Sequence, residues 1–344
     1  MKNFGYIIIL SILISCQSSN TNKPYEGYLF TYFEGQGNRE MQEQLRFAIS
    51  MDAIHWHALN DNKPIIDSEI ISQSGGIRDP HILRKEDQSG FFMVATDMFT
   101  MKNGWDSNPG IILMKSSNLI DWDHSWIDLE NTYPEAFKNV KWVWAPQTIY
   151  DHVAGKYLVY FTVRFHHNEK LDFYGAYAKE DFTGLESVPV LMFSPKYGGI
   201  DGDIVFKDDY YHFFFKGNTK DENGIEVKNG IQRAKSKSLF GIWQEDFEYI
   251  DAYSEQPIVV EGSSIFKLNN ENEYILMYDL YANQRYEFQR SKDLEKFSKE
   301  TESFVKDFHP RHGSVISLTK NELALLKSKW GKHIQFSNSK NNNE

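Results

Sequence analysis

The chain of 344 residues is acidic, with 37 Lys and Arg against 48 Asp and Glu and a net charge of −11. Hydrophobic residues make up 41% and charged residues 25%, which is the composition of a folded protein rather than a disordered one. No basic cluster offsets the negative charge, so we predict no nucleic-acid partner. A single cysteine excludes an intramolecular disulfide framework and a metal site built from several cysteines. Aromatic residues, at 15%, favour packed β-structure.

The first 16 residues have the pattern of an export signal. Lys2 precedes an apolar run over residues 6–14, which is shorter than the roughly 20 residues that span a bilayer. The segment Leu-Ile-Ser-Cys at 13–16 resembles a bacterial lipobox, in which Cys16 would carry the lipid. An ordinary signal peptide is the alternative. Residues 17–25 are polar and indicate a flexible tether. We expect a lipid-anchored protein of the bacterial cell envelope, on its periplasmic or its cell-surface face.

Along the rest of the chain one phrase recurs, in which a serine is followed six or seven positions later by Trp or Phe. The copies are Ser50 to Trp56, Ser116 to Trp122, Ser236 to Trp243 and Ser291 to Phe297, with a degenerate copy from Ala178 to Phe182. Their starts are 66, 62, 58 and 55 residues apart, and each follows an apolar, strand-like run. A repeat of this length predicts an array of similar structural units.

A second phrase, a short polar motif that runs directly into a strand, precedes each unit. The five copies begin Arg78-Asp-Pro-His, Trp144-Ala-Pro-Gln, Ile200-Asp-Gly-Asp, Val260-Glu-Gly-Ser and Arg311-His-Gly-Ser. Turn signals and aromatic-rich strands follow the first four copies, which makes four strands per unit. Four strands repeated about every 60 residues are typical of a β-propeller.

The two ends of the chain complete one another. The first unit lacks a motif strand, and the last motif, at residues 311–318, lacks the later strands. The sequence therefore predicts an all-β, five-bladed β-propeller with four-stranded blades over residues 26–330, its ring closed by pairing of the N- and C-terminal segments. We expect a short helix at 323–330 and a polar tail at 331–344. A two-domain α/β fold is the weaker alternative, because no long amphipathic helix is evident.

In a propeller the innermost strands all begin at the same end of the central channel, so the five motifs predict one polar funnel. Its side chains would be Asp79, Gln147, Asp201, Asp203, Glu261 and His312. Glycoside hydrolysis needs one carboxyl group to protonate the leaving oxygen and another to activate water or attack carbon. A third carboxylate can raise the pKa of the acid. Clustered acids could instead bind Ca²⁺, but the dense spacing of a calcium loop is missing.

These motifs resemble those of glycoside hydrolase family 43, five-bladed propeller enzymes that act on arabinose- and xylose-containing polysaccharides. The resemblance covers roughly residues 26–320. It is closest in Gly-Ile-Arg-Asp-Pro-His-Ile at 76–82 and Met-Tyr-Asp-Leu-Tyr at 277–281, where it points to an exported, arabinosidase-like branch. Asp201 follows Asp79 by 122 residues and Glu261 follows Asp201 by 60, which fits the family's order of carboxylates.

The resemblance implies a role for each motif residue. Asp79 would be the general base, Asp201 the carboxylate that modulates the acid's pKa, and Glu261 the general acid. His312 would be the channel histidine, which commonly helps to hold a structural Ca²⁺, although the chemistry itself requires no cofactor. Trp144 and Gln147 would line the substrate.

Two arginines and three departures from the family pattern bear on the substrate. Arg78 and Arg311 adjoin motif residues and would bind sugar hydroxyls or pair with the acids. Many members have Asp in place of Gln147 and Pro in place of Gly202 and Ser263. These departures spare the proposed catalytic carboxylates but leave the sugar open. Some further aromatic side chains could stack on sugar faces but are more typical of blade core: Trp105, Trp126, Trp142, Phe165 and Tyr281. Asp97, Asp172 and Asp279 could support the site or lie on the surface.

The sequence and the resemblance together predict an inverting glycosidase that acts on arabinose- or xylose-containing glycans. We expect it to be a monomer. It would release terminal α-L-arabinofuranosyl or β-D-xylosyl residues, because the long segments 99–109, 164–172 and 218–229 could wall the funnel and favour an exo mode. The alternatives are a β-D-galactofuranosidase, an endo-arabinanase or xylanase on the same scaffold, and a glycan-binding propeller without turnover.

Overall fold

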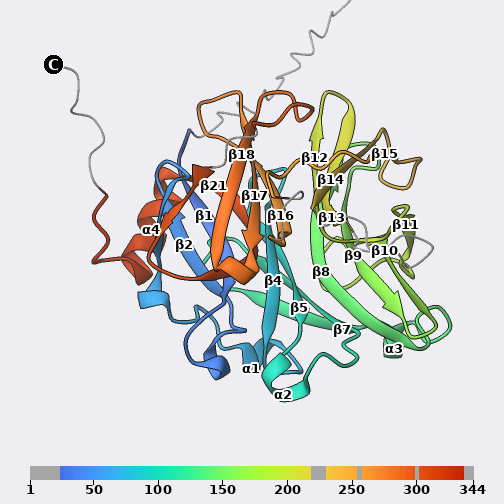
Figure 1. Ribbon diagram of the computed structural model, residues 1–344. Helices are drawn as coiled ribbons and strands as arrows, with labels where there is room; N and C mark the ends of the chain where they lie inside the picture. Colours follow the sequence, from blue (N-terminus) through green and yellow to red (C-terminus); the bar gives the residue numbers. More distant parts are fainter. Residues whose placement is uncertain (1–23, 218–229, 254–257, 299–301, 337–344) are drawn as a thin grey trace, which may run out of the picture.

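Five small sheets stand around a common axis in the computed structural model, which describes residues 24–217, 230–253, 258–298 and 302–336 (Figure 1). This arrangement is the predicted five-bladed β-propeller. Cys16, the export signal, most of the predicted tether and the segment 218–229 lie outside the described residues.

Blades 1 to 5 are named in chain order, and their strands are given from the channel outwards. Blade 1 consists of β21 (Pro310–Thr319), β1 (Tyr25–Glu34), β2 (Arg46–Ser50), β3 (His55–Ala58) and β20 (Val305–Lys306). Blade 2 consists of β4 (Ile77–Arg84), β5 (Phe91–Asp97), β6 (Gly110–Ser116) and β7 (Asp123–Asp128). Blade 3 consists of β8 (Val140–Asp151), β9 (Lys156–Phe165), β10 (Asn168–Tyr177) and β11 (Val190–Phe193).

Blades 4 and 5 repeat the same antiparallel order. Blade 4 consists of β12 (Gly199–Lys207), β13 (Tyr210–Gly217), β14 (Ile231–Ser236) and β15 (Gln244–Asp246). Blade 5 consists of β16 (Glu261–Lys267), β17 (Tyr274–Leu280), β18 (Arg285–Ser291) and β19 (Glu302–Ser303). Four-stranded blades are thus confirmed, with the short β20 added in parallel at the outer edge of blade 1. All five polar motifs lie on innermost strands or directly precede them.

The ring is closed as predicted, by the two ends of the chain. Strand β21 pairs antiparallel with β1 from Thr319 opposite Tyr25 to Pro310 opposite Glu34. In Figure 1 the red β21 accordingly lies beside the blue β1. Because β21 pairs with β1, the inner side of β1 is not left as an open sheet edge.

The repeated serine phrase forms the turn between the third and fourth strands of a blade. In blade 2 the Ser116 hydroxyl accepts hydrogen bonds from the backbone N–H of Asn118 and Leu119, and the Trp122 indole donates to the Leu119 carbonyl. Leu119 takes a positive φ of 67°. Ala53, Phe182 and Leu294 have the same conformation in blades 1, 3 and 5. The repeat is therefore a turn that a hydroxyl closes and an aromatic ring seals.

The hydrophobic core is divided among the spaces between neighbouring blades. Each of five clusters of buried residues draws on two adjacent blades, as where Phe30 and Tyr32 of blade 1 pack with Tyr286 and Phe288 of blade 5. Central strands such as β5 and β17 are buried along their whole length. Because both faces of every blade are covered, the alternation of polar and apolar residues gives way to aromatic-rich runs.

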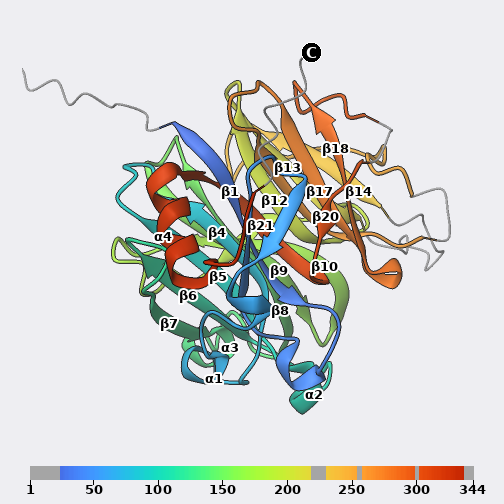
Figure 2. The same cartoon turned by 90° about the vertical axis from the view of Figure 1, so that its left-hand side faces the viewer.

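Helices are few and lie outside the ring. The largest, α4 (Lys320–Trp330), packs on β1 and β21 and begins at a capping box of Thr319 and Glu322 (Figure 2). It confirms the predicted C-terminal helix. Short helices are α1 (Ser68–Ile71), α2 (Thr100–Asn103), α3 (Leu129–Thr132), η1 (Arg39–Met41), η2 (Asn60–Asn62) and η3 (Tyr281–Asn283). Within the described ranges, none of these helices has the length and apolarity needed to cross a membrane.

The fold extends further towards the C-terminus than predicted. Ile334 is only 7% exposed and, with Phe336, packs against the cluster between blades 1 and 2. The predicted polar tail at 331–344 was therefore placed too early, because an isoleucine and a phenylalanine among polar residues cover the end of the core.

Candidate active site

Four predicted side chains meet at one end of the channel, each from a different innermost strand. Asp79 comes from β4, Asp201 from β12, Glu261 from β16 and His312 from β21. They form the floor of a pocket of about 310 Å³. The wall consists of Arg78, Met98, Trp105, Trp144, Ile200, Tyr281 and Arg311.

The backbone at this level is irregular in the same way in four blades. The register between first and second strands shifts at the motif of β4, β8, β12 and β16. The residue in each shift has a positive φ: Asp79 52°, Ala145 46°, Asp201 52° and Gly262 65°. A bulge changes the direction in which a side chain points. Non-glycine residues with a left-handed backbone cost on the order of 1–3 kcal/mol each and are found mostly at functional sites. The bulges thus turn the motif side chains into the channel mouth.

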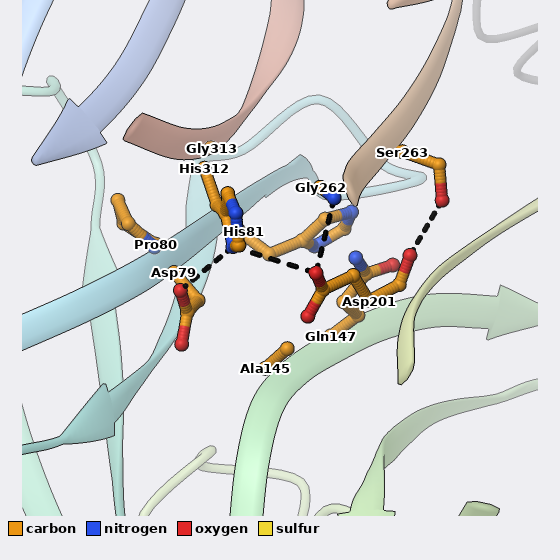
Figure 3. A pocket seen from close by; sticks show the side chains of 10 residues that line it. All are labelled: Asp79, Pro80, His81, Ala145, Gln147, Asp201, Gly262, Ser263, His312 and Gly313. Carbon is orange, nitrogen blue, oxygen red and sulfur yellow. Dashed lines mark hydrogen bonds and ion pairs between the residues drawn. The ribbon is translucent and has the colours of Figure 1, made fainter. Parts of the chain in front are cut away.

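His312 lies at the centre of the carboxylates, and Figure 3 shows it beside two of them, Asp79 and Asp201. Its Nδ1 is 3.2 Å from Asp79 Oδ1 and 3.6 Å from Asp201 Oδ2, and its Nε2 is 3.0 Å from Glu261 Oε1. The residue is 8% exposed. Burial alone would lower the pKa of His312, but the charges of Asp201 and Glu261 and the contacts to Asp79 raise it to about 10. The imidazole is therefore protonated at neutral pH and neutralises part of the cluster.

Asp79 is held as a carboxylate. Its Oδ2 accepts a hydrogen bond of 2.8 Å from the Thr96 hydroxyl, whose oxygen in turn accepts from the Ala145 N–H. Burial acts to raise the pKa of Asp79, but the contact with His312 and the charge of Arg78 outweigh it, so the pKa is lowered. A base must be deprotonated to accept a proton from water, and this environment keeps it so.

Glu261 and Asp201 differ in their surroundings. Glu261 contacts two cations besides His312: Arg311 Nη2 lies 2.6 Å from Oε1 and Lys216 Nζ 3.0 Å from Oε2. Burial acts to raise the pKa of Glu261, yet His312 and Lys216 hold it well below its usual range. Asp201 accepts a hydrogen bond of 3.0 Å from the Gly262 N–H. Its burial, reinforced by the charges of Glu261 and Asp79, raises the pKa of Asp201 although His312 opposes the rise.

The two predicted arginines line the pocket and are both paired with acids. Arg78 Nη1 lies 2.6 Å from Glu43 Oε1, and its guanidinium lies between the rings of Phe33 and Trp105. Arg311 is bound to Glu261 and to Asp279. The sequence left open whether they bind hydroxyls or pair with acids, and the structure shows the pairing.

Aromatic side chains form one side of the pocket. Trp144 and Trp105 meet edge to face at 6.1 Å, and Trp105 is 58% exposed. Trp142 stacks at 4.1 Å behind Trp144, away from the pocket lining. Trp105 belongs to the segment 99–109, so this predicted loop does wall the funnel. Tyr281 stands in the wall as well, whereas Trp126 and Phe165 do not contribute to it.

Behind the pocket the channel narrows to a cavity of about 10 Å³, room for about one water molecule. Figure 3 shows Gln147 and Ser263 here, beside Asp79, Asp201 and His312. The Tyr160 hydroxyl donates to Gln147 Oε1 at 2.8 Å. Gln147 thus lies in the channel behind the pocket, and its predicted contact with substrate stays a prediction.

Two departures from the family pattern have local causes. A Cβ added at Gly202 would come within 2.2 Å of the Phe213 ring, so that ring occupies the space a larger residue would need. The Ser263 hydroxyl donates to the carbonyls of Asp201 and Phe214. Both residues thus fit this chain's own packing rather than a contact with the sugar.

The carboxylates and His312 together resemble a calcium site in their spacing but not in their partners. Asp201, Glu261 and His312 offer ligand atoms within 4.8 Å of one another. Calcium takes six to eight oxygens, however, and both oxygens of Glu261 are already bound by cations. The charge that an ion would supply comes from His312, Arg311 and Lys216. The described residues therefore do not fit a directly bound calcium ion.

Two supporting residues, Lys216 and Glu43, escaped prediction from sequence, and the role of a third, Asp279, was not recognised. Lys216 ends the aromatic run of β13, and Glu43 precedes β2. Asp279 was named only as an acid near the site or on the surface. It is fully buried on β17, and burial raises the pKa of Asp279 to about 6 although Arg311 and His312 lower it. Asp279 lies within the phrase at 277–281, which was the one signal that pointed to it.

Comparison with known proteins gives the family. Residues 23–324 match the profile of the glycoside hydrolase family 43-related domain, described as a "probable glycosyl hydrolase domain". The chain belongs to this family. This match agrees with the resemblance to family 43 that the motifs indicated.

Individual relatives are distant. An α-L-arabinofuranosidase of Bifidobacterium longum is 22% identical over 315 residues, covering 81% of this chain and 29% of that protein. A family 43 protein of Bacillus licheniformis superposes with a TM-score of 0.51 at 17% identity, over 85% of this chain and 50% of the other. An endo-1,4-β-xylanase of Bacteroides thetaiotaomicron gives 0.55 at 13% identity, over 83% and 92%. The chain thus spans less than a third of the first relative and half of the second, and these solved structures support the fold.

Proposed function

We propose that the protein is an inverting, exo-acting glycosidase that releases terminal α-L-arabinofuranosyl residues from a glycan. The observation that carries this proposal is the group of Asp79, Asp201 and Glu261 around His312 at the floor of a pocket whose channel narrows at once behind it. Such a floor admits the end of a glycan rather than the middle of a chain. The similarity to an α-L-arabinofuranosidase supports the choice of sugar.

Inversion requires an acid and a base on opposite sides of the bond, about 6.5–9.5 Å apart. Asp79 and Glu261 contact opposite nitrogens of the His312 ring, at 3.2 and 3.0 Å. The width of an imidazole therefore separates the two carboxyls, which is compatible with that range. Asp79 would take a proton from the attacking water, and Glu261 would give one to the departing oxygen.

The electrostatics of the ligand-free pocket set a condition on this assignment. Lys216, Arg311 and His312 favour the ionised form of Glu261, whereas Asp201 is the carboxyl that holds a proton more readily. For Glu261 to act as the acid, the bound glycan must displace Lys216 from Oε2, which then takes up the proton while Arg311 stays on Oε1. Asp201 then supports the acid by its proximity.

The test uses 4-nitrophenyl α-L-arabinofuranoside, β-D-xyloside and β-D-galactofuranoside with the wild type and with Asp79→Asn, Asp201→Asn and Glu261→Gln. We expect release of nitrophenol from the arabinofuranoside. NMR should show that the sugar is first released with the anomeric configuration opposite to that of the substrate. Asp79→Asn should abolish the release of nitrophenol. Cleavage of the xyloside or galactofuranoside alone would replace the sugar, and retention of configuration would contradict the mechanism.

An endo-acting arabinanase or xylanase is the second candidate, favoured by the exposed Trp105 and the half-buried Trp144 at the pocket rim and by the similarity of fold to an endo-1,4-β-xylanase. Linear arabinan and xylan distinguish the two modes, because an endo enzyme produces oligosaccharides before monosaccharide. A glycan-binding propeller would bind these polymers in an affinity gel and release nothing.

We also propose the cell-envelope location through lipid on Cys16. The described chain begins beside Tyr25, which lines the mouth of the channel opposite the pocket. An anchor joined there would leave the pocket opening away from the membrane. Labelling with radioactive palmitate, in wild type and Cys16→Ser, tests the lipid.

A calcium ion near His312 stays a prediction. The proposed chemistry does not need the ion, because it uses side chains and water alone. Elemental analysis of protein purified without chelator tests it. One calcium per chain would require an ion bound through water, and none would agree with the pairing of Glu261 described above.

A further inference from the structure

Asp279 is the most deeply buried acid near the pocket, and the proposed mechanism does not use it. It is 0% exposed, and it lies in register between Glu261 on β16 and Tyr286 on β18. Residues opposite one another in an antiparallel pair project from the same face of a sheet. Asp279 thus stands directly behind Glu261 on the face of blade 5 that contributes to the pocket.

Arg311 connects the two acids. Its Nε donates to Asp279 Oδ2 and its Nη2 to Glu261 Oε1, each at 2.6 Å. The guanidinium is planar and rigid, so fixing one nitrogen fixes the direction of the other. Arg311 comes from blade 1, whereas Glu261 and Asp279 belong to blade 5. The direction in which Arg311 meets Glu261 therefore depends on Asp279.

The second oxygen of Asp279 indicates that the pair serves more than packing. No group among the described residues hydrogen-bonds Asp279 Oδ1, and the same holds for the buried Tyr286 hydroxyl. A buried carboxylate kept with one oxygen unsatisfied costs stability, and ion pairs of this kind are often replaceable by apolar residues without loss. Such a cost calls for a role in which the position of Arg311 matters.

We propose that Asp279 is a positioning residue for the acid step: through Arg311 it holds the Glu261 carboxyl where the leaving oxygen takes its proton. The inference rests on the proposed function, in which Glu261 protonates the leaving group. Glu261 becomes a carboxylate as it gives up the proton, and an arginine already aligned with Oε1 stabilises that charge without rearrangement. Asp279 supplies the alignment and touches neither the sugar nor the water.

Glu43 provides a matched control. It is a buried carboxylate that holds the other pocket arginine, Arg78, at 2.6 Å, on the side of Asp79. It also accepts hydrogen bonds from the backbone and hydroxyl of Thr100. Removing its charge should loosen Arg78 and the segment that presents Trp105, and therefore affect substrate binding without affecting protonation of the leaving group.

The experiment compares Asp279→Asn and Glu43→Gln on two substrates of the same sugar, a nitrophenyl and a methyl glycoside. Nitrophenolate departs with little help from an acid, whereas methoxide needs a proton. For Asp279→Asn we expect kcat to fall about 30-fold or more on the methyl glycoside and less than about 3-fold on the nitrophenyl glycoside, with KM nearly unchanged. Glu43→Gln should raise KM about equally for both. Equal losses of kcat for Asp279→Asn would overturn the proposal and leave a structural ion pair.

A crystal structure of Asp279→Asn separates this inference from the proposed function. We expect Arg311 Nη2 to move out of hydrogen-bond range of Glu261 Oε1, which requires no substrate to observe. An unchanged contact would overturn the inference even if hydrolysis is confirmed. If the wild type cleaves none of the glycosides, the proposed function fails and the crystallographic result decides alone. Thermal unfolding of each variant shows that the protein compared is folded.

Discussion

Two histidine–carboxylate groups lie along the same channel, and their differences separate chemistry from support. At the pocket, His312 contacts four carboxylates, those of Asp79, Asp201, Glu261 and Asp279, and the first two of these residues have left-handed backbones. Further along, His81 Nε2 lies 3.4 Å from Asp203 Oδ1, two residues after Asp79 and Asp201 on the same strands. The two groups are thus separated by two residues along each strand.

The second group is satisfied by the backbone around it. Asp203 Oδ2 accepts 2.8 Å from the Ile265 N–H, and His81 Nδ1 accepts 3.3 Å from the Thr148 N–H. At the pocket, by contrast, His312 Nδ1 makes ion-pair contacts but no hydrogen bond to any described residue. Strain and incomplete pairing mark the first group, and complete pairing marks the second. These differences support the proposal that the group of His312 carries the chemistry, and they indicate that the pair of His81 and Asp203 stabilises the fold.

Replacing Asp79 with Asn should have the largest effect on activity. We expect kcat/KM to fall by about 10²–10⁴, because the general base is lost while the shape is kept. The free energy of unfolding, measured with urea, should fall, but by less than for Asp203→Ala below, because the lowered pKa of Asp79 shows that the folded protein favours its charged form. Activity within about threefold of wild type would break the comparison, because it would mean that Asp79 is not the general base.

Replacing Asp203 with Ala should do the reverse. We expect the free energy of unfolding to fall by about 3 kcal/mol, because a buried pair is broken and the Ile265 N–H loses its acceptor. The kcat of the folded protein should stay within about threefold of wild type. Asp203→Asn is the control, since an amide oxygen can still accept from Ile265 and the loss should be smaller. A large fall in kcat with unchanged stability would place Asp203 in the chemistry.

The two groups should also differ in how stability depends on pH. His312 has a pKa of about 10 in the folded protein, above the 6.5 of a free histidine. Its contribution to stability is therefore complete below pH 6.5 and is lost as pH rises towards 10. Urea unfolding at several pH values should show this fall in wild type and a flatter curve in His312→Gln. Asp203→Asn should keep the wild-type slope, and an equal slope in His312→Gln would contradict the assignment.

The sequence was sufficient for the fold because each blade repeats two local signals. The serine turn and the motif strand each depend on residues that are close in sequence. The pairing that closes the ring was predicted because the first unit lacks one strand and the last motif supplies it. The four residues at the floor of the pocket were found for the same reason, since equivalent repeat positions reach one mouth of the channel. Asp203 was grouped with them because alternation along the bulged β12 could not be followed without the structure, which pairs it with His81 instead.

The partners of these residues depend on packing between blades, which no repeat encodes. Arg311 reaches Asp279 across the contact between blades 1 and 5, and Lys216 reaches Glu261 from blade 4. Glu43 lies before β2 with no motif around it, yet it holds Arg78 of blade 2. Such contacts join residues whose separation in sequence varies, and only the closed ring brings them together.

Ser263 and Thr148 test the comparison at its smallest scale, because Ser263 is bonded to Asp201 of the first group and Thr148 to His81 of the second. The Ser263 hydroxyl donates to two carbonyls, whereas the buried Thr148 hydroxyl has no hydrogen-bond partner among the described residues. Ser263→Ala should lower the free energy of unfolding by about 1 kcal/mol, since buried acceptors lose a donor. Thr148→Val should leave it unchanged or raise it, because an unpaired hydroxyl is replaced by a methyl group of the same shape. A loss in Thr148→Val equal to that in Ser263→Ala would mean that water pairs the Thr148 hydroxyl, and the channel would then be hydrated along its whole length.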